Sequence, residues 1–152
     1  MIYVDTSVLV PYYSPEPLSE RVQRFLRQRD EIALSDLSEV EFFSALARKV
    51  RARELSREDA RRISAVFAGH LEAGAYTRLE LDRGVYRTAQ GWIGGFNVAL
   101  HTLDALHLAV AATSGVPIAT ADAALARSAR SLGLSVRLFG PRKQAQPRRA
   151  GI

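Results

Sequence analysis

Short apolar runs alternate along the chain with longer segments in which apolar residues recur every three to four positions. Runs of the first kind predict β-strands, and the longer periodicity predicts amphipathic helices. The predicted strands are residues 2–4, 32–34, 76–81, 117–120 and 134–139, of which 76–81 alternates only weakly. The predicted helices are residues 8–13, 18–29, 36–53, 56–70, 84–96, 102–115 and 123–132. Strands separated by helices predict an α/β fold in which a parallel central sheet of four to five strands is flanked by helices on both faces.

Polar residues and prolines mark the boundaries of the first elements. The Asp-Thr-Ser segment at 5–7 follows the first strand and can cap the helix after it. Pro11, Pro15 and Pro17 are expected to break helical structure ahead of the next helix. The segment 102–115 is apolar almost all round, which predicts a helix that is buried on most sides.

Length and composition indicate one domain. A chain of 152 residues with 47% hydrophobic content can form a single core. We expect a domain over residues 1–140 and a basic, disordered tail over 141–152. The absence of cysteine excludes a disulfide framework, thiolate zinc sites and cysteine nucleophiles. No apolar run approaches the roughly 20 residues of a membrane helix, and the opening stretch lacks a basic leader, so we expect a cytoplasmic protein without a membrane segment.

The charge balance is less basic than it first looks. The chain has 21 Lys and Arg residues against 16 Asp and Glu residues, but four of the basic residues lie after Gly140, where there is no acid. Nearly all the positive charge is arginine, whose planar guanidinium suits bidentate contact with phosphate. Nucleic acid is therefore a natural partner to consider, although a solvated helix surface explains the arginines equally well.

Two acidic residues follow predicted strands. Asp5 and Asp122 each stand at or just after the end of a short apolar run. Ligands of open parallel sheets gather beyond the carboxyl ends of the strands, so both carboxylates are candidates for one site. Helix capping explains either position without any function. Ser7 and Thr120 lie two residues from Asp5 and Asp122, respectively, and are candidates to orient them.

Asp104 lies in the predicted buried helix, among leucine, alanine and valine residues. A buried lone carboxylate is costly unless it is neutralised, paired or bound to a cation. The alternative is an acid favoured by the dipole in the first helical turn after Thr102. His107 follows three residues later and could share a metal with Asp104, but a buried histidine with local hydrogen bonds is the favoured interpretation.

Glu41 is ambiguous by spacing alone. A helical projection puts it opposite Phe43 and Leu46, on a face shared with the small residues Ser44 and Ala45. The small residues leave room for a ligand, but the pattern favours an ordinary solvated glutamate.

Several carboxylates at one sheet edge repel one another unless a divalent cation supplies positive charge. An all-oxygen ligand set without cysteine suits Mg²⁺ or Mn²⁺ rather than zinc. The sequence therefore predicts a metal site of this kind.

Four segments in this order resemble the PIN-domain nucleases, in particular the VapC-type toxins of prokaryotic toxin-antitoxin pairs. The segments are IYVDTSVLV, SEVEFFSALARK, TLDALHLAVA and IATADAALARSARSLGLSV, and the likeness spans about residues 2–138. The resemblance implies a PIN-like three-layer sandwich and a Mg²⁺- or Mn²⁺-dependent endoribonuclease. It implies four catalytic acids, which correspond here to Asp5, Glu41, Asp104 and Asp122.

The resemblance also implies roles around these acids. Asp5, Asp104 and Asp122 would hold the metal, and Glu41 would be a further ligand or would position the attacking water. Polar support would come from Thr6, Ser7 and Thr120. Some members have a further acid or Asn just after the fourth carboxylate, whereas alanines and a leucine follow Asp122 here, so a second metal site is expected to be weak or absent.

The expected partners are an RNA substrate, a cognate antitoxin and a second copy of the chain in a homodimer. Arg48, Arg51 and Arg53 are the candidate contacts to the RNA backbone.

Two other function classes remain open. An aspartyl-phosphate phosphatase would use Asp5 as its nucleophile, but Ser7 stands where a second acid would be expected. A non-catalytic RNA-binding or protein-interaction domain could retain the acidic pocket without turnover.

Overall fold

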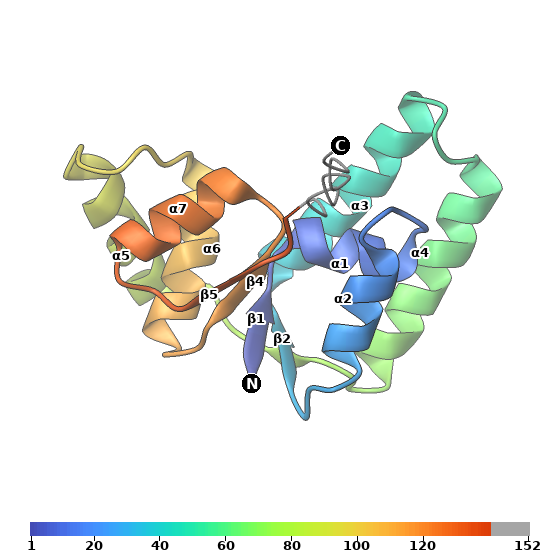
Figure 1. The fold of residues 1–152 in the computed structure, drawn as a ribbon, viewed down its shortest axis with the longest axis horizontal. Coiled ribbons are helices and arrows are strands. Elements are labelled where there is room, and N and C mark those ends of the chain that lie inside the picture. Colours follow the sequence, from blue (N-terminus) through green and yellow to red (C-terminus); the bar gives the residue numbers. More distant parts are fainter. Residues whose placement is uncertain (141–152) are drawn as a thin grey trace, which may run out of the picture.

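The computed structural model describes residues 1–140, and the predicted disordered tail at 141–152 lies outside the described residues. Five parallel strands form one sheet in the order β3-β2-β1-β4-β5 (Figure 1). The strands are β1 Ile2–Val4, β2 Ile32–Leu34, β3 Thr77–Arg78, β4 Ile118–Thr120 and β5 Val136–Leu138. The prediction of a parallel central sheet is confirmed.

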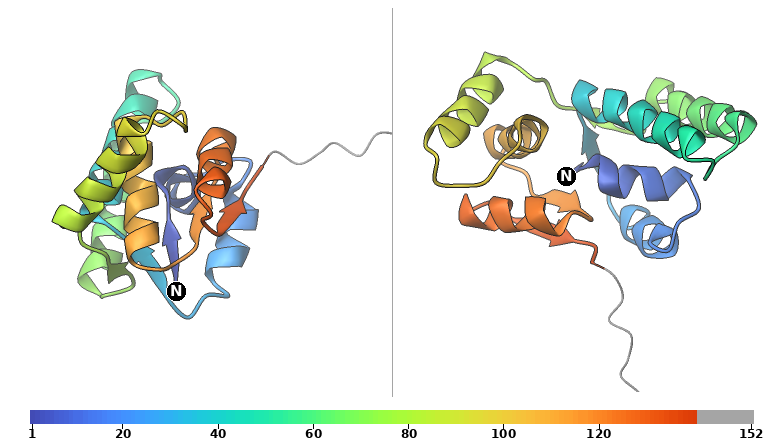
Figure 2. Two further views of the ribbon diagram at one scale, coloured as in Figure 1. Left: turned by 90° about the vertical axis from the view of Figure 1, so that its left-hand side faces the viewer. Right: turned by 90° about the horizontal axis from the view of Figure 1, so that it is seen from above.

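Within the described residues, seven helices connect these strands and cover both faces of the sheet (Figure 2). One face packs against α1, α2, α3 and α4, and the other packs against α5, α6 and α7. The helices are α1 Thr6–Tyr13, α2 Ser19–Leu26, α3 Asp36–Arg51, α4 Arg57–Glu72, α5 Arg83–Gly94, α6 Thr102–Thr113 and α7 Ala123–Ser131. The three-layer arrangement agrees with the expected sandwich. Within residues 1–140 no helix has both the length and the apolar character needed to cross a membrane.

The strands are apolar on both sides because each side meets a different helical layer. Ile2 and Val4 point into the core on the α1–α4 side, whereas Tyr3 points into the core on the α5–α7 side. Ile118 and Ala119 in β4 divide between the two cores in the same way. This alternation is the period-2 geometry of a strand buried on both faces, and it explains the short continuous apolar runs in the sequence.

Two local predictions need correction. Pro11 does not break helical structure, because it lies inside α1 and is buried there. Val8, Leu9 and Val10 bury the helix in the core, and this burial outweighs the one backbone hydrogen bond that proline cannot make. The strand predicted at 76–81 is only two residues long, since β3 is an edge strand that pairs with β2 alone.

The order of the strands places a crevice next to β1. The chain leaves β1 toward β2 on one side and returns later to β4 on the other side. Neighbouring connections therefore diverge at the carboxyl ends of β1 and β4, where open α/β sheets bind their ligands. Helices α1 and α7 begin at this edge, shortly after β1 and β4. Helix α6 leads into the amino end of β4, so its own amino end lies at the same edge.

Candidate active site

A cavity of about 910 Å³ opens at this crevice. Its lining comes from α1, α3, α6 and the segment after β4. All four carboxylates singled out in the sequence line it, namely Asp5, Glu41, Asp104 and Asp122. Residues separated by about 120 positions in the chain are thus brought to one site.

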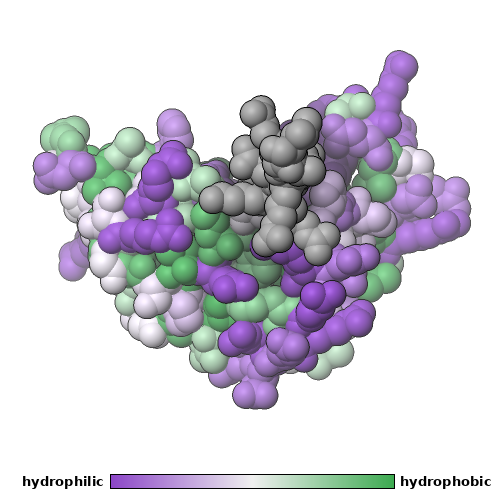
Figure 3. Space-filling model, viewed as in Figure 1, coloured by the Kyte–Doolittle hydropathy of each residue, from purple (hydrophilic) through white to green (hydrophobic). Residues whose placement is uncertain are grey.

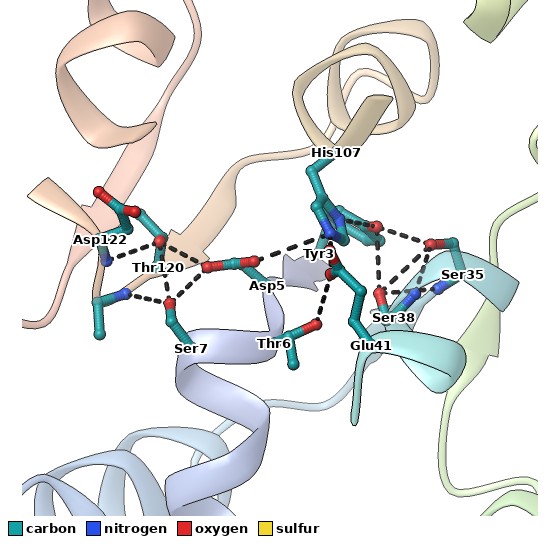
Figure 4. A network of polar contacts seen from close by, with 11 residues as sticks. Tyr3, Asp5, Thr6, Ser7, Ser35, Ser38, Glu41, His107, Thr120 and Asp122 are labelled. Carbon is teal, nitrogen blue, oxygen red and sulfur yellow. Dashed lines mark hydrogen bonds and ion pairs between the residues drawn. The ribbon is translucent and has the colours of Figure 1, made fainter. Parts of the chain in front are cut away.

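Asp5 is 7% exposed and is held by hydroxyl groups (Figure 4). Its Oδ2 accepts hydrogen bonds from Ser7 Oγ and from Thr120 Oγ1, the latter at 2.8 Å. Asp5 occupies the N-cap position of α1, but its side chain makes no capping hydrogen bond. Helix capping therefore does not explain this residue, and its carboxylate is oriented by groups from α1 and β4.

The two hydroxyls around Asp5 are themselves anchored. Ser7 Oγ accepts a hydrogen bond from the backbone N–H of Ala121 at 2.8 Å. Thr120 Oγ1 accepts one from the backbone N–H of Asp122 at 3.0 Å. The sequence left open whether Thr120 orients the Asp122 carboxylate or bonds to backbone. The structure shows the backbone contact to Asp122, together with a contact to the side chain of Asp5. The result is a rigid link between the ends of β1 and β4.

Glu41 projects from α3 toward Asp5 and is 22% exposed at its side chain, so it is not an ordinary solvated residue. Its Oε2 accepts a hydrogen bond from Thr6 Oγ1 at 2.9 Å and lies 2.5 Å from His107 Nε2. His107 Nε2 is also 3.9 Å from Asp5 Oδ1. Asp5, Glu41 and His107 each offer one ligand atom within a group that spans less than 4.8 Å.

The pairing of Glu41 and His107 favours their charged forms. Burial raises the pKa of Glu41, but the His107 and Thr6 hydrogen bonds and the charge of His107 outweigh it, so the net pKa is lowered. Burial lowers the pKa of His107, but the Glu41 hydrogen bond and the nearby Asp5 charge outweigh it, so the net pKa is raised.

His107 is buried, as the sequence suggested, but its hydrogen bonds are not local. Nδ1 lies 2.7 Å from the hydroxyl of Tyr3, which is 104 positions away in the chain. The Tyr3 hydroxyl is in turn 2.7 Å from Ser35 Oγ and 3.2 Å from Ser38 Oγ. Burial raises the pKa of Tyr3 to about 12, so the phenol keeps its proton at neutral pH.

The sequence analysis missed Tyr3, Ser35 and Ser38. A tyrosine between two apolar residues of a short strand, and a Ser-x-x-Ser pair just after the next strand, were the available signals. Ser35 caps α3 in a reciprocal capping box with Ser38. The same two serines therefore start α3 and hold Tyr3.

Asp104 lies in the first turn of α6, where the buried helix emerges at the cavity. It is partly exposed, and its neighbour Leu103 is 48% exposed. Burial, followed by the negative charges of Asp122 and Asp5, raises the pKa of Asp104. The acids of this site therefore repel one another, and a divalent cation would relieve that repulsion.

Asp122 both caps α7 and lines the cavity. Its Oδ1 accepts hydrogen bonds from the backbone N–H groups of Ala124 at 2.6 Å and Leu125 at 3.1 Å, so it caps α7 as the sequence allowed. The residue is exposed and also lines the cavity.

The predicted RNA-contacting arginines separate in space. Arg48 lines the cavity together with Lys49, whose Nζ pairs with Glu16 Oε1 at 2.8 Å. Arg51 lines a different hollow of about 460 Å³ between α3 and α4. Arg53 follows α3 with a positive φ of 60° and lines neither of these two hollows. Hydrophilic side chains cover much of the face over α2, α3 and α4 (Figure 3).

Comparison with known proteins identifies the family. The model of the PIN domain matches residues 2–131. The chain belongs to the PIN-domain family. Ribonuclease VapC46 of Mycobacterium tuberculosis is 34% identical over 138 residues, which cover 89% of this chain and 95% of that protein. The match extends over nearly the whole of both chains, so this PIN domain is of the VapC type.

Solved PIN-domain structures have the same fold. VapC20 of Mycobacterium tuberculosis, described as a toxin that cleaves the sarcin-ricin loop, superposes with a TM-score of 0.65 at 15% identity, covering 88% of this chain and 96% of its own. A toxin-antitoxin complex from Klebsiella pneumoniae superposes with a TM-score of 0.64 at 12% identity, covering 93% and 100% of the two chains. At these identities the likeness is one of fold.

Proposed function

We propose that this protein is a metal-dependent endoribonuclease that acts as the toxin of a toxin-antitoxin pair. The observation that carries the proposal is the convergence of four carboxylates, from four separate elements, on one cavity at the sheet edge. The 34% identity to a VapC ribonuclease over nearly the whole chain supports RNA as the substrate.

The donor set fits Mg²⁺ or Mn²⁺. Carboxylate oxygens without any thiolate are the ligands that these hard cations prefer. The pKa of Asp104 is raised by burial and then by the charges of Asp122 and Asp5, and a bound cation would oppose both effects. In this proposal Asp5, Asp104 and Asp122 hold the ion. When bound, it would polarise the phosphate and make a nucleophile of water at neutral pH.

The protein's own residues orient the reaction. Ser7 and Thr120 bind one oxygen of Asp5 and leave the other oxygen for the ion. In this proposal Glu41 accepts a hydrogen bond from the attacking water. The water oxygen forms a bond to phosphorus and gives up a proton to Glu41, and the bond from phosphorus to the leaving sugar oxygen breaks. That sugar oxygen takes up a proton from solvent, and Glu41 returns its proton to solvent.

Arg48 and Lys49 are the proposed contacts to the RNA backbone beside the acids, since both line the same cavity. Arg51, the last residue of α3, and Arg53, which follows the helix, would act outside this cavity. The proposed regulators are a cognate antitoxin that covers the cavity and a second copy of the chain that forms a homodimer. The Klebsiella structure of the same fold contains a toxin together with its antitoxin, which supports the first of these.

A cleavage assay tests the proposal. Purified protein without a partner is incubated with labelled total small RNA in Mg²⁺, in Mn²⁺ or in chelator, beside the variants Asp5→Asn and Asp104→Asn. We expect cleavage that requires the metal and is lost in both variants. RNA binding without cleavage under every metal condition would instead favour a non-catalytic RNA-binding domain.

A further inference from the structure

A line of buried polar groups connects the core to the candidate site. It runs from the serines that begin α3, through Tyr3 in β1, to His107 in α6 and then to Glu41 (Figure 4). His107 is in the middle of it, with 2% of its side chain exposed. Both ring nitrogens have a partner, so the ring is fixed at two points.

The hydrogen bonds place a proton on Nε2. With a neutral ring, Tyr3 donates to Nδ1 and accepts from the serines, and Nε2–H then donates to Glu41. With a charged ring, both nitrogens carry protons and Nε2–H again donates to Glu41. The remaining tautomer would place a nitrogen lone pair 2.5 Å from a carboxylate oxygen, which is repulsive. The donation to Glu41 is therefore the same in both allowed states.

Both donors to Glu41 meet the same oxygen. Thr6 Oγ1 and His107 Nε2 each bond to Oε2, and within residues 1–140 no hydrogen bond is made to Oε1. We propose that His107 is a positioning residue that, together with Thr6, holds one oxygen of Glu41 and so presents the other to the water or ion in the cavity. The proposal rests on the proposed function of Glu41 in the same site.

This arrangement assigns Glu41 a role as an acceptor through Oε1. Oε2 already accepts two hydrogen bonds, which fix its position and make it a poor acceptor of a further proton. Oε1 is therefore the oxygen that accepts from the cavity. A chain of partners that runs into a buried tyrosine and two buried serines keeps that oxygen rigid.

Two variants of His107 separate positioning from packing. His107→Gln keeps an N–H donor that reaches about as far as Nε2, whereas the amide of His107→Asn reaches only about as far as Nδ1. Both remove the imidazole ring and bury an amide instead. We expect His107→Asn to lower kcat roughly 10- to 100-fold with little change in KM, and His107→Gln to retain most of kcat. The melting temperature should fall by similar amounts in both.

His70 provides a matched control. Its Nδ1 lies 2.7 Å from the hydroxyl of Tyr13, which repeats the contact between His107 and Tyr3, but no carboxylate bonds to its other nitrogen among the described residues. His70→Asn should lower the melting temperature and leave kcat and the Mn²⁺ Kd unchanged. Should His107→Asn fail to fold, Tyr3→Phe tests the same series of hydrogen bonds from Tyr3 to Glu41 by removing one hydroxyl. We expect it to lower kcat about 3- to 10-fold.

A readout without RNA separates this inference from the proposed function. The imidazole Nε2–H of His107 should give a downfield proton resonance by NMR in metal-free protein, and Glu41→Gln should shift it upfield. If the wild type cleaves no RNA, the proposed function fails, while this resonance still supports the geometry. The absence of a proton on Nε2 overturns the inference.

Kinetic and binding outcomes decide the role. A kcat that falls equally in the Gln and Asn variants, in step with the melting temperature, would reduce His107 to a packing residue. A Mn²⁺ Kd, measured by calorimetry, that weakens in both variants as much as in Asp5→Asn would make His107 a direct ligand. Either result overturns positioning, as would full kcat in His107→Asn.

Discussion

At the scale of single residues, two acids of the candidate site each have one carboxylate oxygen fixed by hydrogen bonds, which leaves the other oxygen for a ligand. Asp5 has one oxygen bonded to two hydroxyls, and Glu41 has one oxygen bonded to a hydroxyl and an imidazole. Asp104 differs, because burial and neighbouring acids raise its pKa. The charged form of Asp104 is therefore disfavoured, first by its burial and then by the acids beside it.

Asp104→Asn should stabilise the metal-free protein at neutral pH and abolish cleavage. A raised folded pKa means that stability from the protonated acid is present below the ordinary pKa of about 3.8 and is lost as pH rises through the folded value. The amide cannot ionise and avoids this loss. We expect a gain below about 1 kcal/mol, because the carboxylate is partly solvated. Thermal unfolding measured from pH 3 to pH 7 checks it.

Two conditions should change the difference between wild type and Asp104→Asn. At pH 3 the difference should vanish, because the wild-type carboxyl is largely protonated in the folded and the unfolded state. At pH 7 saturating Mn²⁺ should reverse it, because the ion stabilises the folded wild type more than a variant that has lost one proposed ligand. A variant that melts below the wild type at pH 7 without metal would contradict the expectation.

Thr120 should matter for both the fold and the metal. Thr120→Val keeps the shape but removes a donor to Asp5 and an acceptor for the Asp122 N–H. A hydrogen bond to a charged group contributes about 1.5–3 kcal/mol, so we expect a loss of that order in the free energy of unfolding, with weaker Mn²⁺ binding. Urea unfolding and calorimetry measure the two. Thr120→Ser retains the hydroxyl and should behave like the wild type.

At the scale of elements, three of the four acids lie where helices begin, and Glu41 lies one turn farther on. Asp5 and Asp122 precede α1 and α7, Glu41 is in the second turn of α3, and Asp104 is in the first turn of α6. Backbone N–H groups at helix amino ends are unpaired and favour negative charge, which helps to offset the repulsion among the acids. The helix starts and the acidic site are thus parts of one arrangement.

Two substitutions of Asp122 separate its capping role from its proposed role as a metal ligand. Asp122→Asn keeps an oxygen that can accept from the Ala124 and Leu125 N–H groups, whereas Asp122→Ala removes the cap. We expect Asp122→Ala to cost about 1 kcal/mol of stability and Asp122→Asn much less. Both should lose metal-dependent cleavage. Equal stability of the two variants would show that the cap contributes nothing measurable.

At the scale of the whole molecule, positive charge is spread over the surface and only part of it faces the acids. The net charge is +5, and within residues 1–140 the basic residues that line the acidic cavity are Arg48 and Lys49. Charge close to the cavity should govern RNA binding at the site, and more distant arginines should act through long-range attraction that salt screens.

The salt dependence of RNA binding tests this division. Arg48→Gln should reduce the slope of log K against log salt by about 0.7, the value for one contact to a single strand. Arg87→Gln, on the exposed surface of α5, should leave the slope nearly unchanged. Filter binding in chelator over a range of salt gives both slopes without cleavage. Equal slopes for Arg48→Gln and wild type would remove Arg48 from the interface.

Sequence periodicity predicted the elements well because the spacing of apolar residues within an element reflects which of its faces are buried. The apolar runs at 2–4, 32–34 and 118–120 are strands buried on both faces, and the nearly all-apolar segment from Thr102 is the buried helix α6. Pro11 was misjudged, since local breaking rules do not include the burial energy of the whole helix. The weak strand at 76–81 shortened because the edge of a sheet offers one partner only.

By itself the sequence determined the α/β class and the parallel sheet, and it placed Asp5, Asp104 and Asp122 near strand ends or a helix start, because these depend on local pattern and on the rule that strand ends share an edge. The spacing around Glu41 favoured a solvated glutamate, and only the resemblance to a known family singled it out. Only the tertiary structure decided which groups meet. His107 and Glu41 are 66 positions apart, and neither their pairing nor the contact with Tyr3 leaves a local signal. Periodicity tells which face of an element is buried, and the packing of distant elements determines what lies opposite that face.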